Sequence, residues 1–487
     1  MSHRWMKSRR TPLTIACVVA AAAVGTGCSD DPFAGATDTI GGEITRGDTL
    51  LFVGESATYA ARAIYGVGPG SPTAMRWGAS DTTVLEVDVL RDLTAQIRAL
   101  APGAAWLVAL VNEEFRDSVL VTVVDRGAER WDATFADVPV AVYPAVGADS
   151  LIRVVTGGAS PLLRILSPES GVFTSTASCF GALGPSLGAA DETYASGGPC
   201  ARRHARNGEP QWTAPVAEAV LGVAVVADGG AIVLTTDSVI RLGADGSPLW
   251  GLLLGGAPVT APVLGPGGDV YVGWSAGGAD SVSRFALAGS LLWSVAVPGL
   301  SAGTPAATSL RLIFGRPGGV FALESTGVVA WDRSFADVNP AATPTSRTSS
   351  PVHDDLDLYV QNEEALYAYT LGGTFVWAAD SLGFGATAGV VGAPTLLVDA
   401  TLAVPCTSGS GGRDVCVVRE TTGARVWRSP VGDGPVDGLT VGDDGIIYVT
   451  RTLAAGGSQV AALWARVAPA TTGWPTEGGN PEHTRRR

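Results

Sequence analysis

The chain has 487 residues, with 32 lysines and arginines against 46 aspartates and glutamates, which gives a formal net charge of −14. An acidic surface repels nucleic-acid phosphates, so sequence-independent binding to nucleic acid is disfavoured. The 46% of hydrophobic residues excludes global disorder, and the 64 glycines and 30 prolines favour many short strands and turns over long helices.

The first 27 residues have the pattern of an export signal. Four basic residues within the first ten positions precede an apolar run from Leu13 to Val24, which is too short to span a bilayer. This run ends in V-G-T-G-C at positions 24–28, which resembles the lipobox of bacterial lipoproteins. The resemblance implies cleavage before Cys28 and acylation of its thiol, with ordinary signal cleavage nearby as the alternative. Residues 28–40 then form a linker.

Four cysteines follow the signal region and the lipobox: Cys179, Cys200, Cys406 and Cys416. An even number in an oxidising compartment suggests two disulfides, and proximity in the sequence favours Cys179–Cys200 and Cys406–Cys416. Metal binding is the rival interpretation. No C-x-x-C motif occurs and few histidines are present, so zinc is disfavoured and no metal site is predicted.

Residues 41–126 alternate between apolar and polar side chains, as half-buried strands do. Valines 119, 121 and 123 share one face of such a strand, opposite Ser118 and Thr122. Runs of this kind between glycine-rich breaks predict a small β-sandwich. The stretches at 53–56, 75–81, 84–88 and 103–108 resemble, in their order, a bacterial Ig-like domain of group 2. The resemblance implies a spacer or stalk with Trp77 in its core and no catalytic residues.

Residues 127–487 contain an internal repeat. A glycine followed four residues later by a tryptophan recurs along this region, a degenerate copy lies at 170–173, and a final variant ends in Trp474. The spacing of these copies gives eight units of about 45 residues, the signature of a repeat architecture. The complete pairs are Gly127…Trp131, Gly208…Trp212, Gly246…Trp250, Gly289…Trp293, Gly327…Trp331, Gly373…Trp377 and Gly423…Trp427.

Each unit has the same order of short apolar runs and turns. In one of them Trp250 is expected to open the first strand, followed by strands at 261–264, 270–273 and 283–287. Asp-Gly and Gly-Gly between apolar runs are hairpin signals. The predicted fold is therefore all-β: an Ig-like sandwich followed by a β-propeller of eight four-stranded blades, with seven blades as the alternative.

The repeated tryptophans are interpreted as structural residues. A buried indole removes about 150–250 Å² from water, so one per blade, packed against the neighbouring blade, would hold the ring together. Packing of this kind is preferred over stacking on a ligand. The blade tryptophans are Trp131, Trp212, Trp250, Trp293, Trp331, Trp377, Trp427 and Trp474.

Three stretches, at 243–250, 322–331 and 420–427, resemble the PQQ-type propeller repeat of quinoprotein dehydrogenases and their non-catalytic relatives. The segment 474–484 resembles one found at the ends of such propellers. The dehydrogenases carry adjacent cysteines beside the quinone and a set of Ca²⁺ ligands, whereas this chain has no Cys-Cys pair. The expectation is a non-catalytic member without a cofactor. PQQ and Ca²⁺ belong only to the alternative, a divergent dehydrogenase.

Four motifs that could carry chemistry favour structural interpretations. Residues 273–277 match G-x-S-x-G, but a strand rather than a helix is expected after them. A hairpin turn explains the His-Asp-Asp of 353–355, and the Asp-Asp of 443–444 has no EF-hand spacing around it. The basic stretch 202–206 is either a solvated strand or a contact with a partner.

The predicted protein is exported and anchored by lipid, in the periplasm or at the cell surface, with the outer membrane as the expected membrane. Its expected function is non-catalytic binding or scaffolding, through a propeller face or the loops at 176–200 and 333–350. Expected partners are other envelope proteins or extracellular ligands, and the membrane through the lipid, but no nucleic acid. One variant resembles the propeller lipoprotein that assists assembly of outer-membrane β-barrels.

Overall fold

The computed structural model contains 41 strands and one short 3₁₀ helix, η1 (Phe335–Asp337), within the residues it describes. The prediction of an all-β fold is confirmed. The predicted signal, Cys28 and Trp474 lie outside the described residues, and no described helix is long and apolar enough to cross a membrane. The described residues are 39–65, 75–91, 93–111, 115–136, 140, 143–180, 184–265, 267–380, 392–407, 413–431, 436–453, 456–472, 475–476 and 479.

The chain divides into two compact units. The larger consists of Leu50–Glu55, Ala99–Gly103 and Thr122 to the C-terminus, and the smaller of the remaining residues before Thr122.

Strands β1–β8 form two four-stranded sheets. Ala61 of one sheet and Met75 and Ala109 of the other meet in an apolar cluster, against which Trp77 packs. The two sheets therefore form a sandwich, and its assignment as Ig-like stays a prediction. One sheet has the order β1 (Thr39–Arg46), β3 (Ser56–Tyr65), β6 (Thr94–Ala99) and β5 (Leu85–Arg91). The other has the order β2 (Leu50–Phe52), β8 (Phe115–Val124), β7 (Gly103–Val111) and β4 (Met75–Ala79).

The larger unit contains eight sheets of antiparallel strands within the described residues. The first three are β10 (Ala145–Val146), β11 (Ile152–Thr156), β12 (Leu162–Leu166) and β13 (Phe173–Ala177); β14 (Ser186–Leu187), β15 (Thr193–Ser196), β16 (Cys200–His204) and β17 (Pro210–Pro215); and β18 (Val220–Val225), β19 (Ala231–Thr235), β20 (Ser238–Leu242) and β21 (Pro248–Leu253). In the fourth, β22 (Ala257–Pro258) and β23 (Val263–Leu264) both pair with β24 (Val270–Ala276), followed by β25 (Ala279–Phe285) and β26 (Leu291–Val297).

The remaining sheets follow the same order of neighbouring strands. They are β27 (Ala306–Ala307), β28 (Arg311–Arg316), β29 (Gly319–Glu324) and β30 (Val329–Ser334); β31 (Val352–His353), β32 (Asp357–Gln361), β33 (Leu366–Thr370) and β34 (Phe375–Ala379); β35 (Thr395–Leu397), β36 (Thr401–Thr407), β37 (Arg413–Arg419) and β38 (Arg425–Ser429); and β39 (Val436–Val441), β40 (Ile446–Thr452), β41 (Ser458–Trp464) and β9 (Glu129–Phe135).

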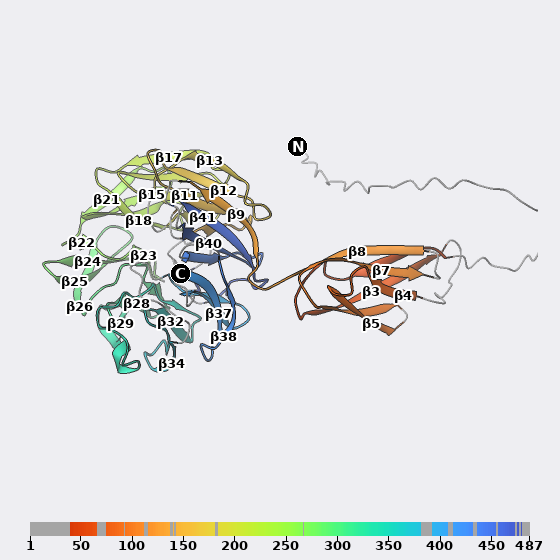
Figure 1. Ribbon diagram of the computed structural model, residues 1–487. Helices are drawn as coiled ribbons and strands as arrows, with labels where there is room; N and C mark the ends of the chain where they lie inside the picture. The colour runs from red at the N-terminus through yellow and green to blue at the C-terminus, as the bar shows by residue number, and fades with distance from the viewer. Residues whose placement is uncertain are drawn as a thin grey trace, which may run out of the picture. The chain divides into compact units, whose positions relative to one another are not determined.

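The sheets are arranged around a common centre, which gives a propeller (Figure 1). The last sheet closes the ring, because its fourth strand, β9, comes from the beginning of the larger unit. Trp131 of β9 lies opposite Ala462 of β41, although the two residues are far apart in the sequence. Ring closure of this kind removes the two open sheet edges that a linear array would leave.

The structure corrects the frame of the predicted repeat. Trp250 does not open a sheet: it lies in β21, the fourth strand of its sheet, opposite Arg241 of β20. The predicted second strand at 261–264 overlaps β23, and the predicted third and fourth strands correspond to β24 and β25. The sequence of a glycine turn and the strand after it is the same whether that strand is the first or the fourth of a sheet. Spacing alone therefore cannot assign the tryptophan strand to one sheet or to the next.

Inner strands of several propeller sheets are almost completely buried. All five residues of β11 and of β19 are buried, as are the first five of β29. Strands that neighbouring sheets cover on both faces become continuous apolar runs. The fourth strands form the rim and alternate between exposed and half-buried residues, as β21 and β26 do.

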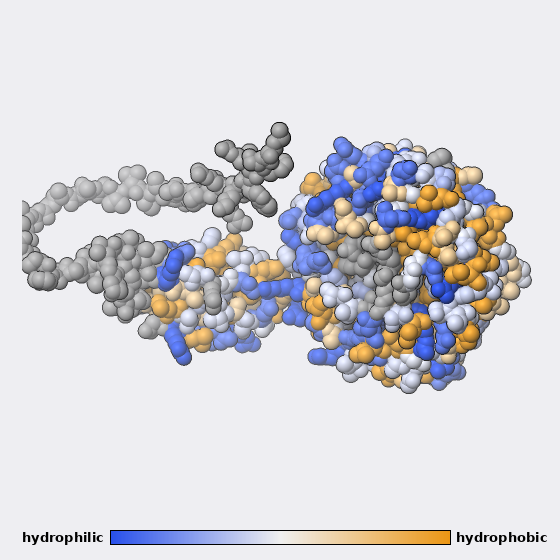
Figure 2. Space-filling model, turned by 180° about the vertical axis from the view of Figure 1, so that it is seen from behind, coloured by the Kyte–Doolittle hydropathy of each residue, from blue (hydrophilic) through white to orange (hydrophobic). Residues whose placement is uncertain are grey.

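Large apolar side chains remain exposed on this rim. Leu253 of β21 is 77% exposed, and Leu291 and Leu292 of β26 are also exposed. Apolar surface gathers at the right-hand rim of the propeller in Figure 2, over the region of β21 and β26.

The connections between strands define two faces. We call loop face the one that carries the connections from strand 2 to strand 3 and from strand 4 to the next sheet, including the long connections 178–185 and 335–351. The opposite turn face carries the short turns between strands 1 and 2 and between strands 3 and 4. Antiparallel neighbours place alternate connections at opposite ends of a sheet.

Candidate binding surfaces of the propeller

The repeated glycines and tryptophans meet between neighbouring sheets. Gly246 has a φ of +81°, and a Cβ there would lie 2.7 Å from Cδ2 of Trp212 in the preceding sheet. The indole therefore packs directly on the glycine backbone. The other contacts of this kind are Trp131 with Gly171, Trp250 with Gly289, Trp293 with Gly327, Trp331 with Gly373, Trp377 with Gly423 and Trp427 with Gly127.

Six of these indoles also donate a hydrogen bond to the turn that carries the glycine. The acceptors are the carbonyl oxygens of Pro168 for Trp131, Ala244 for Trp212, Leu287 for Trp250, Ser325 for Trp293, Leu371 for Trp331 and Glu420 for Trp377, at 2.7–3.0 Å. Each indole thus fills a socket formed by the next sheet and satisfies its polar atom there. Trp427 of β38 packs on Gly127, beside β9, and so links the seventh sheet to the last one.

One sheet departs from this pattern. In β10–β13 the residue opposite Arg164 is Ser175, at the position that tryptophan occupies opposite Arg203, Arg241 or Arg284 in other sheets. Gly208, in the next sheet, would meet Cδ1 of Ile165 at 3.0 Å instead of an indole. The degenerate copy therefore keeps the glycine of the repeat, Gly171, but Ser175 occupies the position of the tryptophan.

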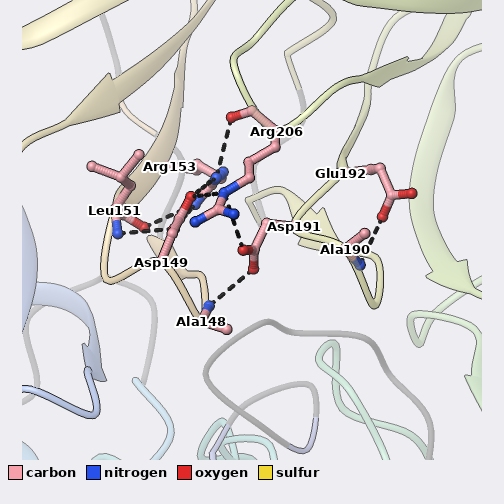
Figure 3. A network of polar contacts seen from close by, with 8 residues as sticks. All are labelled: Ala148, Asp149, Leu151, Arg153, Ala190, Asp191, Glu192 and Arg206. Carbon is pink, nitrogen blue, oxygen red and sulfur yellow. Dashed lines mark hydrogen bonds and ion pairs between the residues drawn. The ribbon is translucent and has the colours of Figure 1, made fainter. Parts of the chain in front are cut away.

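A buried ion network spans the same sheet interface (Figure 3). Arg153 of β11 is completely buried and donates to both carboxylate oxygens of Asp149, at 2.9 and 2.8 Å. Arg206 of the next sheet donates to Asp149 at 2.9 Å and lies 3.6 Å from Asp191. Burial opposes ionisation of Asp149, but the hydrogen bonds from Arg153 and Arg206 and the charge of Arg153 outweigh it and hold its pKa at about 2.

Arg153 stands where other sheets have a tyrosine. It lies opposite Ala145 in β10, as Tyr194 lies opposite Ser186 and Tyr271 opposite Val263. Those tyrosines pack edge-to-face against the tryptophan of their own sheet, with ring centroids 6.1 and 5.9 Å apart. The first sheet thus has Arg153 and Ser175 where these other sheets have a tyrosine and a tryptophan. The ion pairs of Asp149 with Arg153 and Arg206 form part of the contact between the first two sheets.

The basic stretch 202–206 makes its polar contacts within the propeller. Arg202 donates to the carbonyl oxygen of Ala177, and Arg203 forms an ion pair of 2.6 Å with Glu192. His204 is buried between Ser178 and the carbonyl oxygen of Gly208, and burial lowers its pKa to about 4. The charged side chains of the stretch are used within the propeller, which favours the structural interpretation.

The other motifs are also built into strands and turns. Ser275 of the G-x-S-x-G match lies in β24, opposite Asp280 of β25, and no helix follows it. His353 is buried, and its Nε2 lies 3.1 Å from the carbonyl oxygen of Ala307. Asp444 accepts a hydrogen bond of 2.6 Å from the hydroxyl of Tyr448. No group of three or more His, Cys, Asp or Glu residues that could hold a metal ion occurs in the part of the chain that the structure describes.

Both predicted disulfides are present and lie on the loop face. Cys179 follows β13 in the connection 178–185 and is bonded to Cys200, the first residue of β16, with Cα atoms 6.0 Å apart. Cys406 of β36 is bonded to Cys416 of β37, with Cα atoms 5.8 Å apart. The first disulfide ties the connection 178–185 to the next sheet, and the second links the adjacent strands β36 and β37.

The loop face also contains an apolar cavity of about 330 Å³. Leu300 and Ala302 line it from the connection before β27, Pro317 from the β28–β29 turn, and Thr345 and Arg347 from the connection 335–351. The stretch 333–350 thus contributes to a concave surface. Of the stretch 176–200, residues 178–180, 184–185 and 197–199 belong to the loop face, whereas the turn 188–192 lies on the turn face.

An acidic group on the turn face was missed by the sequence analysis. The hydroxyl of Tyr359 donates to Glu420 at 2.8 Å, and Glu420 shares a hydrogen bond with Asp354 across two neighbouring sheets. Burial and this contact raise the pKa of Glu420 to about 7. The three residues come from different strands and turns, so no local motif could have brought them together.

Comparisons with known proteins agree with this fold. A family model described as outer membrane protein assembly factor BamB matches residues 278–438. The chain is similar to the crystal structure of BamB from Moraxella catarrhalis, with 14% identity, a TM-score of 0.52 and coverage of 69% of this chain and 100% of that chain. It is also similar to the computationally designed Ika8 protein, with 14% identity, a TM-score of 0.51 and coverage of 70% and 100%. No curated protein matches at a significant level. The larger unit is thus a β-propeller, and its residues 278–438 are similar to the BamB family model.

Proposed function

We propose that this protein is a non-catalytic binding module of the cell envelope, anchored through a lipid on Cys28, and that its loop face binds other envelope proteins. The observation that carries the proposal is the cavity of about 330 Å³ on the loop face, which is lined by residues of three separate connections. Ala302, Pro317 and Thr345, one from each connection, are exposed. Concave, mainly apolar surfaces with a few polar groups are the usual places where proteins bind partners or ligands.

Two further features support this face. The disulfide Cys179–Cys200 restrains the connection 178–185, and restraint lowers the entropic cost of ordering a binding surface. The match of residues 278–438 to the BamB family model includes the residues that line the cavity, such as Leu300, Pro317 and Thr345. That relationship favours an envelope protein as the partner, since the fold alone does not specify a function.

Site-specific photo-crosslinking in the native envelope tests the proposal. A photoreactive amino acid replaces Thr345 or Ala302, which are exposed beside the cavity, and in a matched variant Asp245, which is exposed in a turn of the opposite face. Crosslinks to a defined envelope protein are expected from Thr345 and Ala302 and not from Asp245. Equal yields from all three positions, or none from the cavity, would contradict the proposal.

Fractionation tests the anchor separately. The proposed lipid holds the protein on membranes through Cys28 alone, so Cys28→Ala should move the exported protein from the membrane fraction to the soluble one. A Cys17→Ala variant, altered within the predicted signal, is the matched control and should remain with membranes. Membrane attachment of Cys28→Ala from which the signal has been cleaved would exclude lipidation at this residue and leave the binding role of the loop face unaffected.

A further inference from the structure

The sheet interface that lacks a tryptophan contains a cavity. It has a volume of about 230 Å³ and lies between the sheets β10–β13 and β14–β17. Its walls include Leu163 and Ile165 of β12, Ser175 and Thr176 of β13, and Gly208 and Pro210 of the next sheet. This site lies at the turn-face end of the interface, away from the loop face.

The cavity occupies the place of an indole. Ser175 has the same register as Trp212 in β17 and Trp250 in β21, each four residues after a glycine of positive φ. Where those indoles meet Gly246 and Gly289, the atoms nearest to a Cβ at Gly208 belong to Ile165 and Thr176. Replacing tryptophan by serine while keeping the glycine leaves the socket without its ring.

The socket also retains a hydrogen-bond acceptor. The indoles of Trp212 and Trp250 donate to the carbonyl oxygen two residues before the socket glycine, at 3.0 and 2.9 Å. The corresponding carbonyl here belongs to Arg206, and it receives a long hydrogen bond of 3.3 Å from Arg153. A carbonyl oxygen has two lone pairs, so it can accept a second donor.

The size and chemistry of the site select its occupant. An apolar cavity of about 150 Å³ already takes up benzene in a protein interior, so this larger one has room for a two-ring system. Its walls combine the side chains of Leu163, Ile165 and Pro210 and the backbone of Gly208 with polar residues, among them Thr174, Asn207 and Glu209. The carbonyl oxygen of Arg206, next to Asn207 in the chain, corresponds to the acceptor that the neighbouring sockets offer to their own indoles.

We propose that this vacant socket binds a tryptophan side chain presented by a partner protein. The indole enters between the two sheets, packs on Gly208 and donates its N–H to the carbonyl oxygen of Arg206. In this way the partner supplies the ring that the first sheet lacks.

Titration of the full chain with N-acetyl-tryptophanamide tests the proposal, with N-acetyl-leucinamide as the probe for general hydrophobic binding. Calorimetry and saturation-transfer NMR should detect the tryptophan amide at one site. Ser175→Ala is the control, because it removes the hydrogen bond of 3.2 Å from Arg164 that is also lost in the other Ser175 variants. It leaves the socket empty, so this variant should bind the tryptophan amide as the original protein does. Ser175→Trp fills the socket from within and should weaken binding by about tenfold or more.

A second variant provides a positive control. Trp250→Ser empties an equivalent socket in another sheet and should add a second binding site for the tryptophan amide. Binding to Trp250→Ser but not to the original protein would overturn the proposal, as would equal affinity of the original protein and Ser175→Trp. If Ser175→Trp fails to fold, Ser175→Phe replaces it with a smaller ring and the same expected loss.

Discussion

At the scale of single residues, Asp149 supports an unusual contact between sheets. Arg153 is completely buried, and its guanidinium group depends on the carboxylate of Asp149 for two hydrogen bonds. Removing one partner of a buried ion pair leaves an uncompensated charge. Asp149→Ala should therefore lower the free energy of unfolding of the propeller by about 3–5 kcal/mol, measured by chemical denaturation.

The matched control for Asp149→Ala is an exposed carboxylate. Glu324→Ala, at the exposed end of β29, should change the free energy of unfolding by no more than about 0.5 kcal/mol. Equal effects of the two substitutions would show that the ion network adds nothing to the interface.

Glu420 should make stability depend on pH near neutrality. Its pKa is raised from 4.5 to about 7 in the folded protein, chiefly by burial, so between these values the folded state holds a proton that the unfolded state has lost. The contribution of Glu420 to stability is therefore complete below pH 4.5 and decreases as the pH rises to about 7. Glu420→Gln tests this dependence, because an amide can form the same hydrogen bonds but does not lose a proton in this pH range.

The free energy of unfolding of this variant, relative to that of the original protein, should rise between pH 4.5 and 7. A difference that does not change with pH would contradict this account.

Individual functional residues were predicted with uneven success, for physical reasons. The disulfide between Cys406 and Cys416 was predicted correctly because the two cysteines are only 10 residues apart in the sequence. Ser175 carries no signal of its own, because an absent ring is visible only when the register of its strand is compared with that of the other sheets. Glu420 and Asp354 come from neighbouring sheets, and only tertiary packing brings their carboxyl groups together.

At the scale of structural elements, the glycine turns position the tryptophans. Gly246 and Gly268 have φ values of +81° and +79°, but only Gly246 lies against an indole, whereas a Cβ at Gly268 would meet nothing within 4 Å. Both alanine variants suffer the strain of a left-handed backbone, about 1–2 kcal/mol. Gly246→Ala must in addition displace Trp212. It should cost more than Gly268→Ala in chemical denaturation, and it should shift the fluorescence of Trp212. Equal costs would mean that the indole contact is dispensable.

The repeat itself was readable from the sequence because its signals are local. A glycine that needs positive φ and a tryptophan four residues later belong to one turn and one strand, and Trp293 and Trp331 occupy that strand as the spacing indicates. The prediction that each tryptophan opens a sheet was wrong, because these tryptophans lie in the fourth strand of the preceding sheet. Which sheet a strand joins depends on the strand with which it pairs, and the spacing of the repeat does not encode this pairing.

At the scale of the whole molecule, β9 closes the ring. Ala133 of β9 and Ala379 of β34 are buried alanines two residues after the tryptophan of their strands. Proline at either position disturbs a fourth strand. If β34 detaches, the chain still joins its sheet to the next one, whereas loss of β9 leaves the first and last sheets unconnected. Ala133→Pro should therefore increase the radius of gyration in small-angle scattering more than Ala379→Pro does. Similar radii for the two variants would contradict the role of β9 in closure.

The closing strand also has a consequence for synthesis. Asp132 of β9 bonds to Gln459 of β41, 327 residues later. At about 5–20 residues per second, translation supplies the partner of β9 roughly 15–65 s after β9 itself. The first strand of the propeller must therefore remain unpaired until β41 has been made. A nascent chain that is interrupted before β41 has an incomplete ring with two open sheet edges, whose backbone groups are unpaired.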